Sequence, residues 1–553
     1  MATKGRQLLL DLLKDEGVDV IFGNPGTTEL PLLDALCADD RFRYVLGLQE
    51  AAVMAMADGY ARATQRLAVV NLHAAPGLGN AMGMLYDAAK AGAPVVVTAG
   101  QQALGFGLTE PILYADLPQL ARPLVKWAAE VPSVADLSRM VHRAAKVALA
   151  PPTGPVFLSL PTDVLNASVA VRTSRPTRVA AAVSGDPDAI RATADLLAAA
   201  RSPIIVAGDS VVQSGAEAEL AALAERLGCA VHIECEPTTL PFAPAHPLYG
   251  GVFARTAKPI RAMLETHDLL LSVGADLFTF SKPDVDPLPP DLTIVHIDTD
   301  PWQLGKNFAA DQAILGSPKA TLPLLVEALA TRMDPAARRL AAERARTTAA
   351  QHDEARAALV ARAEREAADR PLKPLPVMRT IAAGLPADAV VVQEALSSTP
   401  GLVQFLRLGR RNSYFATRGG GIGWGIAAAV GVKLARPAQP VVALIGDGSA
   451  MYTIQALWTA AHEKLAIVFI VLNNRSYRIL KQNMITARGA TNAEQRFLAM
   501  DLVDPMIDYP GLARSMGIDA VAVDTLDGLS AQIAEKLAGD RPVLIDVALD
   551  GSV

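Results

Sequence analysis

The stretch VVALIGDGSA at residues 441–450 decides how this sequence folds. Its first five residues are apolar, as in a strand buried on both faces of a parallel sheet. The letters GDGS at 446–449 predict a sharp turn, and a helical pattern follows from 453 to 462. A second apolar run from 466 to 472 ends in two asparagines. We therefore expect a strand, helix and strand unit whose two polar loops lie at one edge of a parallel sheet, where open α/β sheets bind ligands.

The two polar loops offer oxygen ligands for a hard divalent cation. Asp447 carries a carboxylate, Asn474 an amide oxygen and Ser476 a backbone carbonyl. Mg²⁺ is bound by one or two such groups together with water and phosphate oxygens. Gly448 and Ser449 can turn backbone amides toward a phosphate. We expect a diphosphate on Mg²⁺ (or Ca²⁺) here; the alternative is that the two loops are ordinary turns.

The same alternation of strands and helices occurs in three blocks of the 553 residues. This length is too great for a single core, and alternating strands and helices predict parallel sheets. The expected fold class is α/β, with three tandem doubly wound parallel-sheet domains. We expect domains at 1–170, 185–335 and 377–553, with a helical linker at 336–376.

Composition excludes several functional classes. A net charge of −6 gives no basic surface for nucleic acid. The three cysteines lack the spacing of a metal site and are expected to be reduced. No apolar stretch is long enough to cross a membrane, and the charged first helix is no signal peptide. We expect a cytoplasmic protein.

Glu50 begins a helix whose next residues are almost wholly apolar, AAVMAMADGYA. One interpretation is that its charge only complements the helix dipole. The other is that the carboxylate, shielded from water, hydrogen-bonds a bound cofactor.

His73 stands where an apolar strand enters a loop rich in proline and glycine. The loop GNPGTT at 23–28 ends a strand at the same expected edge. A histidine in this place has either a structural role or the role of a proton donor that orients a substrate.

The chain resembles the thiamine diphosphate (ThDP) dependent 2-keto acid decarboxylases, and among them most closely the benzoylformate decarboxylases. Asn474 follows Asp447 by 27 residues, which matches the ThDP signature, and the resemblance covers nearly the whole chain. The segments that carry it are FGNPGTTELP at 22–31, LQEA at 48–51, ADGYA at 57–61, NLHAAPGLGNAMG at 71–83, VTAGQQ at 97–102, RPLVKW at 122–127, GDGSA at 446–450 and ALWTAA at 456–461.

The resemblance implies a pyrimidine-binding, a central and a diphosphate-binding domain. It also implies an active site shared between two subunits, in a homodimer at least and a homotetramer by expectation. Glu50 would activate the cofactor, while Thr27 and His73 would hold the substrate, a 2-keto acid. Cofactor contacts are implied for Asn24, Pro25, Glu50, Leu396, Ser397, Gly420, Ile422, Gly446, Asp447, Gly448, Ser449, Asn474, Ser476 and Tyr477.

The substrate pocket departs from the family's pattern. The family supplies a second histidine from the central domain, where this chain places Ser281. A serine cannot replace imidazole in proton transfer near neutral pH. Ile479 and Asn483 would make the pocket wall bulkier or more polar. We therefore expect decarboxylation to an aldehyde and carbon dioxide, with carboligation to a second aldehyde favoured if protonation is slow.

Two other functions stay open from the sequence. One is a carbon–carbon ligase or lyase of the acetolactate synthase or 2-hydroxyacyl-CoA lyase kind. The other is an inactive nucleotide-binding or regulatory protein on the same scaffold, which the presence of Glu50, Asp447 and Asn474 disfavours.

Overall fold

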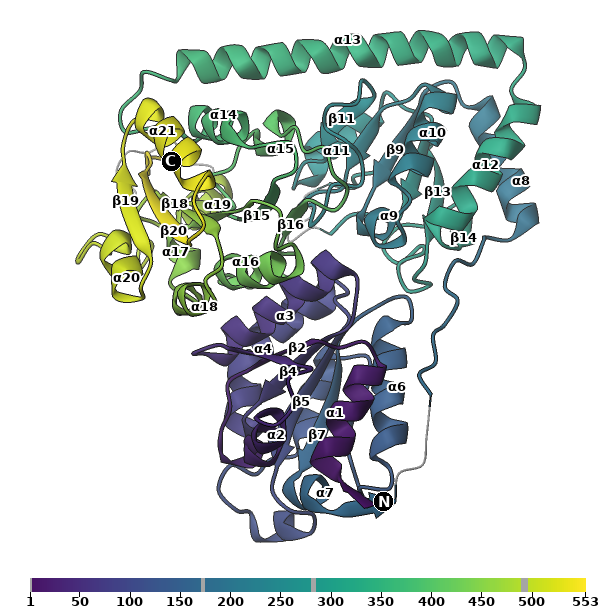
Figure 1. The fold of residues 1–553 in the computed structure, drawn as a ribbon. Coiled ribbons are helices and arrows are strands. Elements are labelled where there is room, and N and C mark those ends of the chain that lie inside the picture. Colours follow the sequence, from purple (N-terminus) through teal and green to yellow (C-terminus); the bar gives the residue numbers. More distant parts are fainter. Residues whose placement is uncertain (1, 171–174, 280–284, 489–495) are drawn as a thin grey trace. The chain divides into compact units, whose positions relative to one another are not determined.

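The structure is a computed structural model that describes residues 2–170, 175–279, 285–488 and 496–553 (Figure 1). Two compact units divide the chain. The first contains residues 1–179, 369–400 and 415–553, and the second contains 180–368 and 401–414. The first unit holds two six-stranded sheets and the second holds one. The expected fold class is confirmed.

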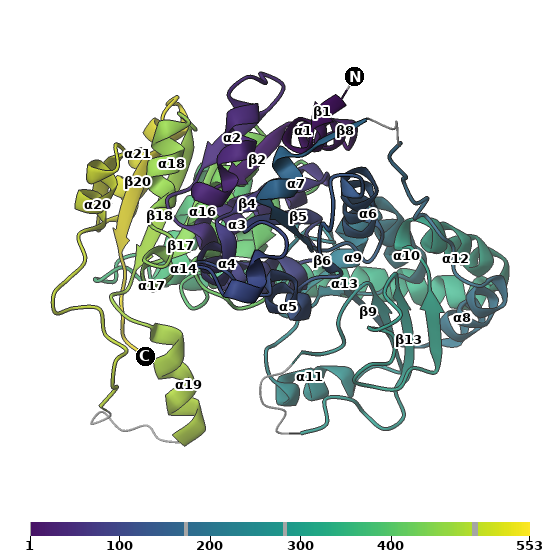
Figure 2. The same ribbon diagram turned by 90° about the horizontal axis from the view of Figure 1, so that it is seen from below.

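The N-terminal sheet has the strand order β3-β2-β4-β5-β7-β6, and its neighbouring strands pair in parallel. Its strands are β2 (Val20–Gly23), β3 (Arg43–Leu46), β4 (Ala68–Leu72), β5 (Val95–Gln101), β6 (Ala128–Glu130) and β7 (Val156–Pro161). Its helices are α1 (Gly5–Asp15), α2 (Leu30–Leu36), α3 (Glu50–Thr64), α4 (Ala74–Lys90), α5 (Leu117–Ala121), α6 (Leu137–Leu149) and α7 (Thr162–Asn166). At the chain start, β1 (Ala2–Lys4) pairs antiparallel with β8 (Ser168–Ala170) (Figure 2).

Strand β4 shows why this sheet is covered on both faces. All of its residues are buried. Val69 belongs to the core beneath α1 and α6, whereas Val70 and Leu72 belong to the core beneath α3 and α4. Successive side chains of a strand point to opposite faces, so a continuous apolar run needs helices on both sides.

The C-terminal sheet has the order β16-β15-β17-β18-β20-β19. Its strands are β15 (Val390–Glu394), β16 (Tyr414–Ala416), β17 (Val441–Gly446), β18 (Ile467–Asn473), β19 (Asp519–Val523) and β20 (Val543–Ala548). Its helices are α14 (Pro374–Gly384), α16 (Trp424–Ala435), α17 (Asp447–Ala450), α18 (Ala456–His462), α19 (Arg478–Arg488), α20 (Tyr509–Ser515) and α21 (Leu526–Leu537).

The second unit repeats the plan with the strand order β11-β10-β9-β12-β13-β14. Its strands are β9 (Pro203–Ala207), β10 (Val231–Ile233), β11 (Tyr249–Val252), β12 (Leu269–Val273), β13 (Thr293–Asp298) and β14 (Gln312–Leu315). Its helices are α8 (Pro187–Ala199), α9 (Asp209–Ser214), α10 (Glu217–Leu227), α11 (Ala257–Leu264), α12 (Pro318–Arg332), α13 (Pro335–Arg365) and α15 (Leu402–Phe405). A cavity of about 790 Å³ lies between α13 and the amino ends of these strands.

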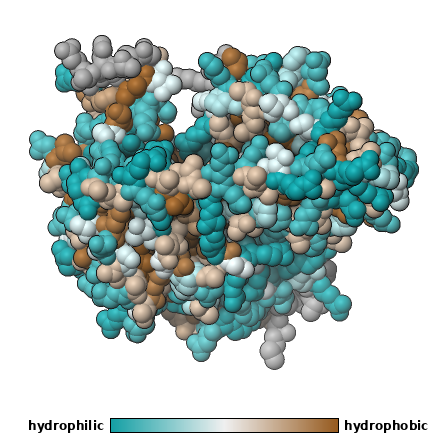
Figure 3. All heavy atoms as spheres, turned by 90° about the horizontal axis from the view of Figure 1, so that it is seen from above, coloured by the Kyte–Doolittle hydropathy of each residue, from teal (hydrophilic) through white to brown (hydrophobic). Residues whose placement is uncertain are grey.

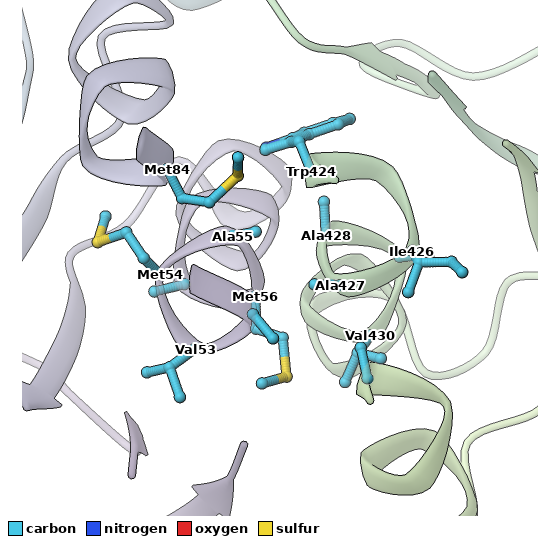
Figure 4. Close-up of a cluster of buried hydrophobic side chains, with 14 of the residues drawn as sticks. Val53, Met54, Ala55, Met56, Met84, Trp424, Ile426, Ala427, Ala428 and Val430 are labelled. Atoms are coloured by element: carbon cyan, nitrogen blue, oxygen red, sulfur yellow. The ribbon is translucent and has the colours of Figure 1, made fainter. Parts of the chain in front are cut away.

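Helices α3 and α16 pack against each other in the first unit (Figure 4). They run antiparallel, because Gly59 faces Ala428 while Met56 faces Gly431. A Cβ atom on Gly59 would lie 2.4 Å from the carbonyl oxygen of Ala428, so only glycine fits there. The two helices and the sheets beneath them share one hydrophobic core.

Two helices begin elsewhere than the sequence pattern suggested. The loop expected after His73 is instead the first turn of α4, which begins at Ala74 and contains Pro76 and Gly77. Proline is tolerated there because the first turn needs no N–H donor. The helix expected from 453 begins at Ala456.

No helix in the described ranges is long and apolar enough to span a membrane. On the face shown in Figure 3, hydrophobic residues are scattered among hydrophilic ones.

Candidate active site

The GDG turn and the asparagine pair lie side by side at the carboxyl edge of the C-terminal sheet. Strands β17 and β18 pair in parallel, with Gly446 opposite Leu472. Both loops therefore leave the sheet at the same level, as the sequence pattern predicted. The backbone N–H groups of Arg475 and Ser476 approach the carboxylate of Asp447.

The carboxylate of Asp447 is buried and incompletely hydrogen-bonded. Its Oδ1 accepts from the N–H of Gly448 at 2.9 Å, whereas its Oδ2 is buried without a hydrogen-bond partner among the described atoms. Burial raises the pKa of Asp447 to about 6, because the charged form loses its water. A bound cation would supply the missing partner.

Asn474 is buried beside Asp447 and is fixed by its own turn. Its amide oxygen accepts from the N–H of Ser476 at 3.0 Å and from the Ser476 hydroxyl at 3.2 Å. Its amide nitrogen donates to the hydroxyl of Ser398 at 3.1 Å. Across the described ranges, no three His, Cys, Asp or Glu side chains come together as a metal site. A cation here would thus rely on mixed oxygen donors, as Mg²⁺ does.

The glycine turn before α16 is held by two buried carboxyl groups. The N–H of Gly423 donates to Glu394 at 2.6 Å, and the N–H of Gly421 donates to Asp87 at 3.1 Å. Burial raises the pKa of Glu394 and of Asp87 to about 7. Gly420 has φ +80°, and a Cβ there would meet nothing within 4 Å. The two carboxyl groups therefore hold the turn on one side, whereas the space beside Gly420 is open. Ile422, close to Gly420 in the same turn, is half-buried.

Glu50 lies at the start of α3 and is 9% exposed. Its Oε2 accepts from the amide of Asn80 at 3.0 Å, and a Cβ on Gly77 would lie 3.3 Å from its Oε1. The helix is capped by Gln49, whose side chain accepts from Ala51 and Ala52. Capping thus needs no contribution from Glu50.

His73 is the residue before α4, and its ring is tied to the loop that follows β2. Its Nδ1 lies 2.8 Å from Oε2 of Glu29 and 3.1 Å from the hydroxyl of Thr28. Thr27, which the resemblance placed at the substrate, is exposed. Thr28 and Glu29 were not among the predicted site residues, although both lie in the FGNPGTTELP stretch at 22–31. The sequence feature that could have identified them is the presence of a glutamate and a second hydroxyl on the loop that faces His73.

Of the remaining candidates that the structure describes, most lie on loops at the ends of strands and two lie on helix α19. Asn24 and Pro25 are half-buried after β2. Leu396 is exposed, and the carbonyl of Ser397 accepts from Arg478 at 3.2 Å. Gly448 packs against the Tyr477 ring, since a Cβ atom on this glycine would lie 2.4 Å from Cε1 of the tyrosine. On α19, Ile479 is half-buried and Asn483 is exposed. Ser281 lies outside the described residues.

Within one chain, Glu50 and the glycine turn at 419–423 lie at opposite ends of the α3 and α16 pair. Arg62, near the end of α3, donates to the carbonyl of Ala416 at 3.0 Å and lies over the Trp424 ring at 5.1 Å. Gly419 contacts Asp87, near the end of α4. Glu50 and Arg62 are 12 residues apart in the helix, about 18 Å at ~1.5 Å per residue. A single chain thus keeps Glu50 well away from the glycine turn.

Family models match all three blocks of the chain. They are the N-terminal TPP binding domain (residues 3–107), the central domain (190–325) and the C-terminal TPP binding domain (397–547) of thiamine pyrophosphate enzymes. The chain belongs to the thiamine pyrophosphate (ThDP) enzymes. It is a ThDP-dependent carbon–carbon lyase of the decarboxylase family.

Named relatives of this ThDP enzyme fall into two groups. It is 35% identical to the benzoylformate decarboxylase of Pseudomonas aeruginosa over 97% of both chains. It is 30% identical to the acetolactate synthase large subunit of Parasynechococcus marenigrum, over 98% of this chain and 87% of the relative. The solved thiamine diphosphate-dependent 4-hydroxybenzoylformate decarboxylase of Rhodococcus jostii superposes with a TM-score of 0.86, at 32% identity and 99% coverage of each chain. These matches confirm the family resemblance drawn from the sequence.

Proposed function

We propose that this ThDP enzyme decarboxylates a benzoylformate-like 2-keto acid to an aldehyde and carbon dioxide, with Mg²⁺ as its metal and with carboligation as a second outcome. The observation that carries the proposal is the pair of half-sites: a sheltered Glu50 at one end of α3, and an Asp447 oxygen that has no partner among the described atoms at the carboxyl edge of the C-terminal sheet. The similarity to two aryl keto acid decarboxylases supports the aryl substrate.

The residues of the C-terminal edge fit a diphosphate on a cation. Asp447, Asn474 and the Ser476 carbonyl would hold the metal, while Gly448 and Ser449, in the short helix α17 (Asp447–Ala450), would lie against the phosphates. Gly420 leaves open space beside Ile422 for the other end of the cofactor. When bound, ThDP supplies the carbon nucleophile and the electron sink that decarboxylation requires.

Glu50 would hold a proton at the ring nitrogen of the cofactor's aminopyrimidine. Asn80 fixes its Oε2, and Gly77 leaves room beside Oε1. Because the side chain is shielded from solvent, water does not compete for that hydrogen bond. His73 and Thr27 would orient the carbonyl and the carboxylate of the substrate, and His73 would move a proton there.

A second copy of the chain would complete each site. The antiparallel α3 and α16 pair places Glu50 and the glycine turn at opposite ends, so one chain cannot present both to one cofactor. A partner related by a two-fold axis brings its Glu50 to the glycine turn and receives the same in return. We therefore propose a homodimer as the smallest active unit, with a homotetramer built from two of them.

Carbon dioxide release tests the proposal directly. The enzyme is incubated with ThDP, Mg²⁺ and either benzoylformate, pyruvate or a 2-hydroxyacyl-CoA. We expect carbon dioxide and an aldehyde from benzoylformate with the largest kcat/KM. Turnover of the acyl-CoA without turnover of any keto acid would overturn the proposal.

A second candidate is carbon–carbon ligation of the acetolactate synthase kind, which the 30% identical relative favours. Formation of acetolactate from pyruvate faster than aldehyde from benzoylformate would support it. The same incubations decide between the two when both products are measured.

A further inference from the structure

The carboxylate of Glu29 lies behind His73 and is almost completely buried. It ends the short 3₁₀ turn at Thr27–Glu29 and is 1% exposed. His73 follows β4, and Gly100 belongs to β5, so three neighbouring strands, β2, β4 and β5, bring the group together at one edge of the sheet.

Four polar groups point at the two oxygens of Glu29. Oε1 accepts from the Thr28 hydroxyl at 2.6 Å and from the N–H of Gly100 at 2.9 Å. Oε2 accepts from the N–H of Gly26 at 2.9 Å and lies 2.8 Å from Nδ1 of His73. An ionised carboxylate only accepts hydrogen bonds. Opposite an ionised Glu29, the hydrogen of the His73 ring would therefore sit on Nδ1.

Two glycines make this approach possible. A Cβ atom on Gly26 would lie 2.1 Å from Nδ1 of His73, and one on Gly100 would lie 2.2 Å from Oε1 of Glu29. Both distances are far below contact distance. The ring and the carboxylate can meet only because side chains are missing at these two positions.

We propose that Glu29 is the positioning residue of His73. It fixes the ring plane and keeps the hydrogen on Nδ1, so that Nε2 is the nitrogen that exchanges a proton with the substrate. The inference rests on the proposed function, because it assigns the proton-transfer atom of that same site. Thr28 supports it by donating to Glu29, which fixes the carboxylate that in turn fixes the ring.

The Glu29→Gln variant tests this role with little change of volume. Either orientation of the glutamine amide removes the negative charge and sets an NH₂ group against two of the four donors. We expect kcat for benzoylformate to fall about 10²-fold to 10⁴-fold, as when the orienting acid of a catalytic histidine is removed. KM should change by a much smaller factor, because Glu29 does not contact the substrate.

The chain offers a matched control in Glu16. This buried glutamate lies 2.6 Å from Nδ1 of His142 and also pairs with Arg178, at the amino edge of the same sheet. Glu16→Gln removes a buried glutamate–histidine pair without touching the site. It should lower thermal stability while leaving kcat within about twofold of the wild type. An equal loss of kcat in both variants would mean that Glu29 acts through stability alone.

A spectroscopic measurement on the unchanged holoenzyme keeps the test independent of folding. Nitrogen-15 labelled histidine rings are recorded by NMR, and His73 is assigned by the signal lost in His73→Asn. We expect a hydrogen on Nδ1 in the wild type. A His73 ring with a bare Nδ1, or Glu29→Gln with wild-type kcat, would overturn the role of Glu29. A wild type with the expected ring signal but no turnover of any keto acid would instead overturn the proposed function alone.

Discussion

The half-site around Glu50 at the N-terminal sheet and the half-site around Asp447 at the C-terminal sheet differ in how fully the protein itself hydrogen-bonds their carboxylates. At the N-terminal sheet, Glu29 has four polar neighbours and Glu50 has Asn80, so both carboxylates are held by the protein itself. At the C-terminal sheet, Asp447 and the nearby Asp546 each keep one buried oxygen without a hydrogen-bond partner among the described atoms. The half-site at the N-terminal sheet is therefore preorganised, and we expect the half-site at the C-terminal sheet to gain stability when its proposed ligands bind. Four substitutions, ordered from the largest expected effect to the smallest, test this difference.

Replacing Glu50 should lower activity strongly without unfolding the half-site at the N-terminal sheet. We expect kcat in Glu50→Gln to fall about 10²-fold to 10⁴-fold, because the amide cannot exchange a proton with the cofactor ring. The fold should persist, since Gln49 caps α3. Steady-state carbon dioxide release and circular dichroism measure the two quantities. Full activity in Glu50→Gln would contradict the assignment.

Replacing Asp447 should remove the stabilisation that ligands give to the half-site at the C-terminal sheet. Saturation at about 100 times Kd stabilises a wild-type protein by about 2.7 kcal/mol. In Asp447→Asn we expect the rise in Tm with ThDP and Mg²⁺ to disappear, because the metal loses its carboxylate. Dialysis against a chelator should have the same effect on the wild type. Differential scanning calorimetry with and without ligands decides the matter, and an unchanged rise in Tm would refute the metal site.

Adding a methyl group between α3 and α16 should destabilise the helix pair that separates the two half-sites. In Gly59→Ala the new methyl meets the carbonyl oxygen of Ala428, and overpacking of this kind costs about 1–3 kcal/mol. Gly384→Ala is the control, because its methyl meets side-chain atoms of Ile533, at 2.9 Å, and no backbone atom. Urea denaturation should show the larger loss for Gly59→Ala. The reverse order would mean that the helices can separate.

Neutralising Asp87 should change how stability depends on pH. Burial raises its pKa to about 7, so between its unfolded pKa and pH 7 the folded state binds the extra proton. Stability should therefore fall as pH rises from about 4 to 7 and level off above that. Asp58 and Glu394 add negative charge nearby, and Arg62 opposes them.

In Asp87→Asn this fall should be smaller, since each pKa unit corresponds to about 1.4 kcal/mol. The asparagine oxygen can still accept from Gly421, as Oδ1 of Asp87 does. Denaturation midpoints at pH 5 and pH 8 provide the measurement. An equal slope in both proteins would show that Asp87 is ionised throughout.

The long apolar strands and the residues at their ends could be predicted from the sequence. The strands expected at 441–445 and 466–472 are β17 and β18, with bounds that differ by at most one residue, and Asp447 and Asn474 follow them at one sheet edge as expected. Short edge strands such as β6, β14 and β16 cannot be predicted in this way, because three or four residues show no clear period.

The supporting groups could not be predicted in the same way. Asn80, Asp87 and Glu394 meet their partners only after helices from different parts of the chain pack together. Glu29 lies in a stretch that carried the family resemblance. The sequence of a polar loop, however, does not indicate which of its side chains is buried. Thr27 was preferred because of the resemblance, whereas the hydroxyl beside His73 belongs to Thr28.

Helix α3 lies so close to α16 that the neighbouring backbone allows only glycine at residue 59, and the alanines around it are buried in the shared core. Residues 55, 57, 59 and 61 are fully enclosed or nearly so, and none of them has a reactive group. A saturation mutagenesis screen would reject large replacements at these positions as firmly as at Glu50. The intolerance of a residue to change, taken alone, would thus mark this helix as catalytic when it is a spacer that keeps two functional ends apart.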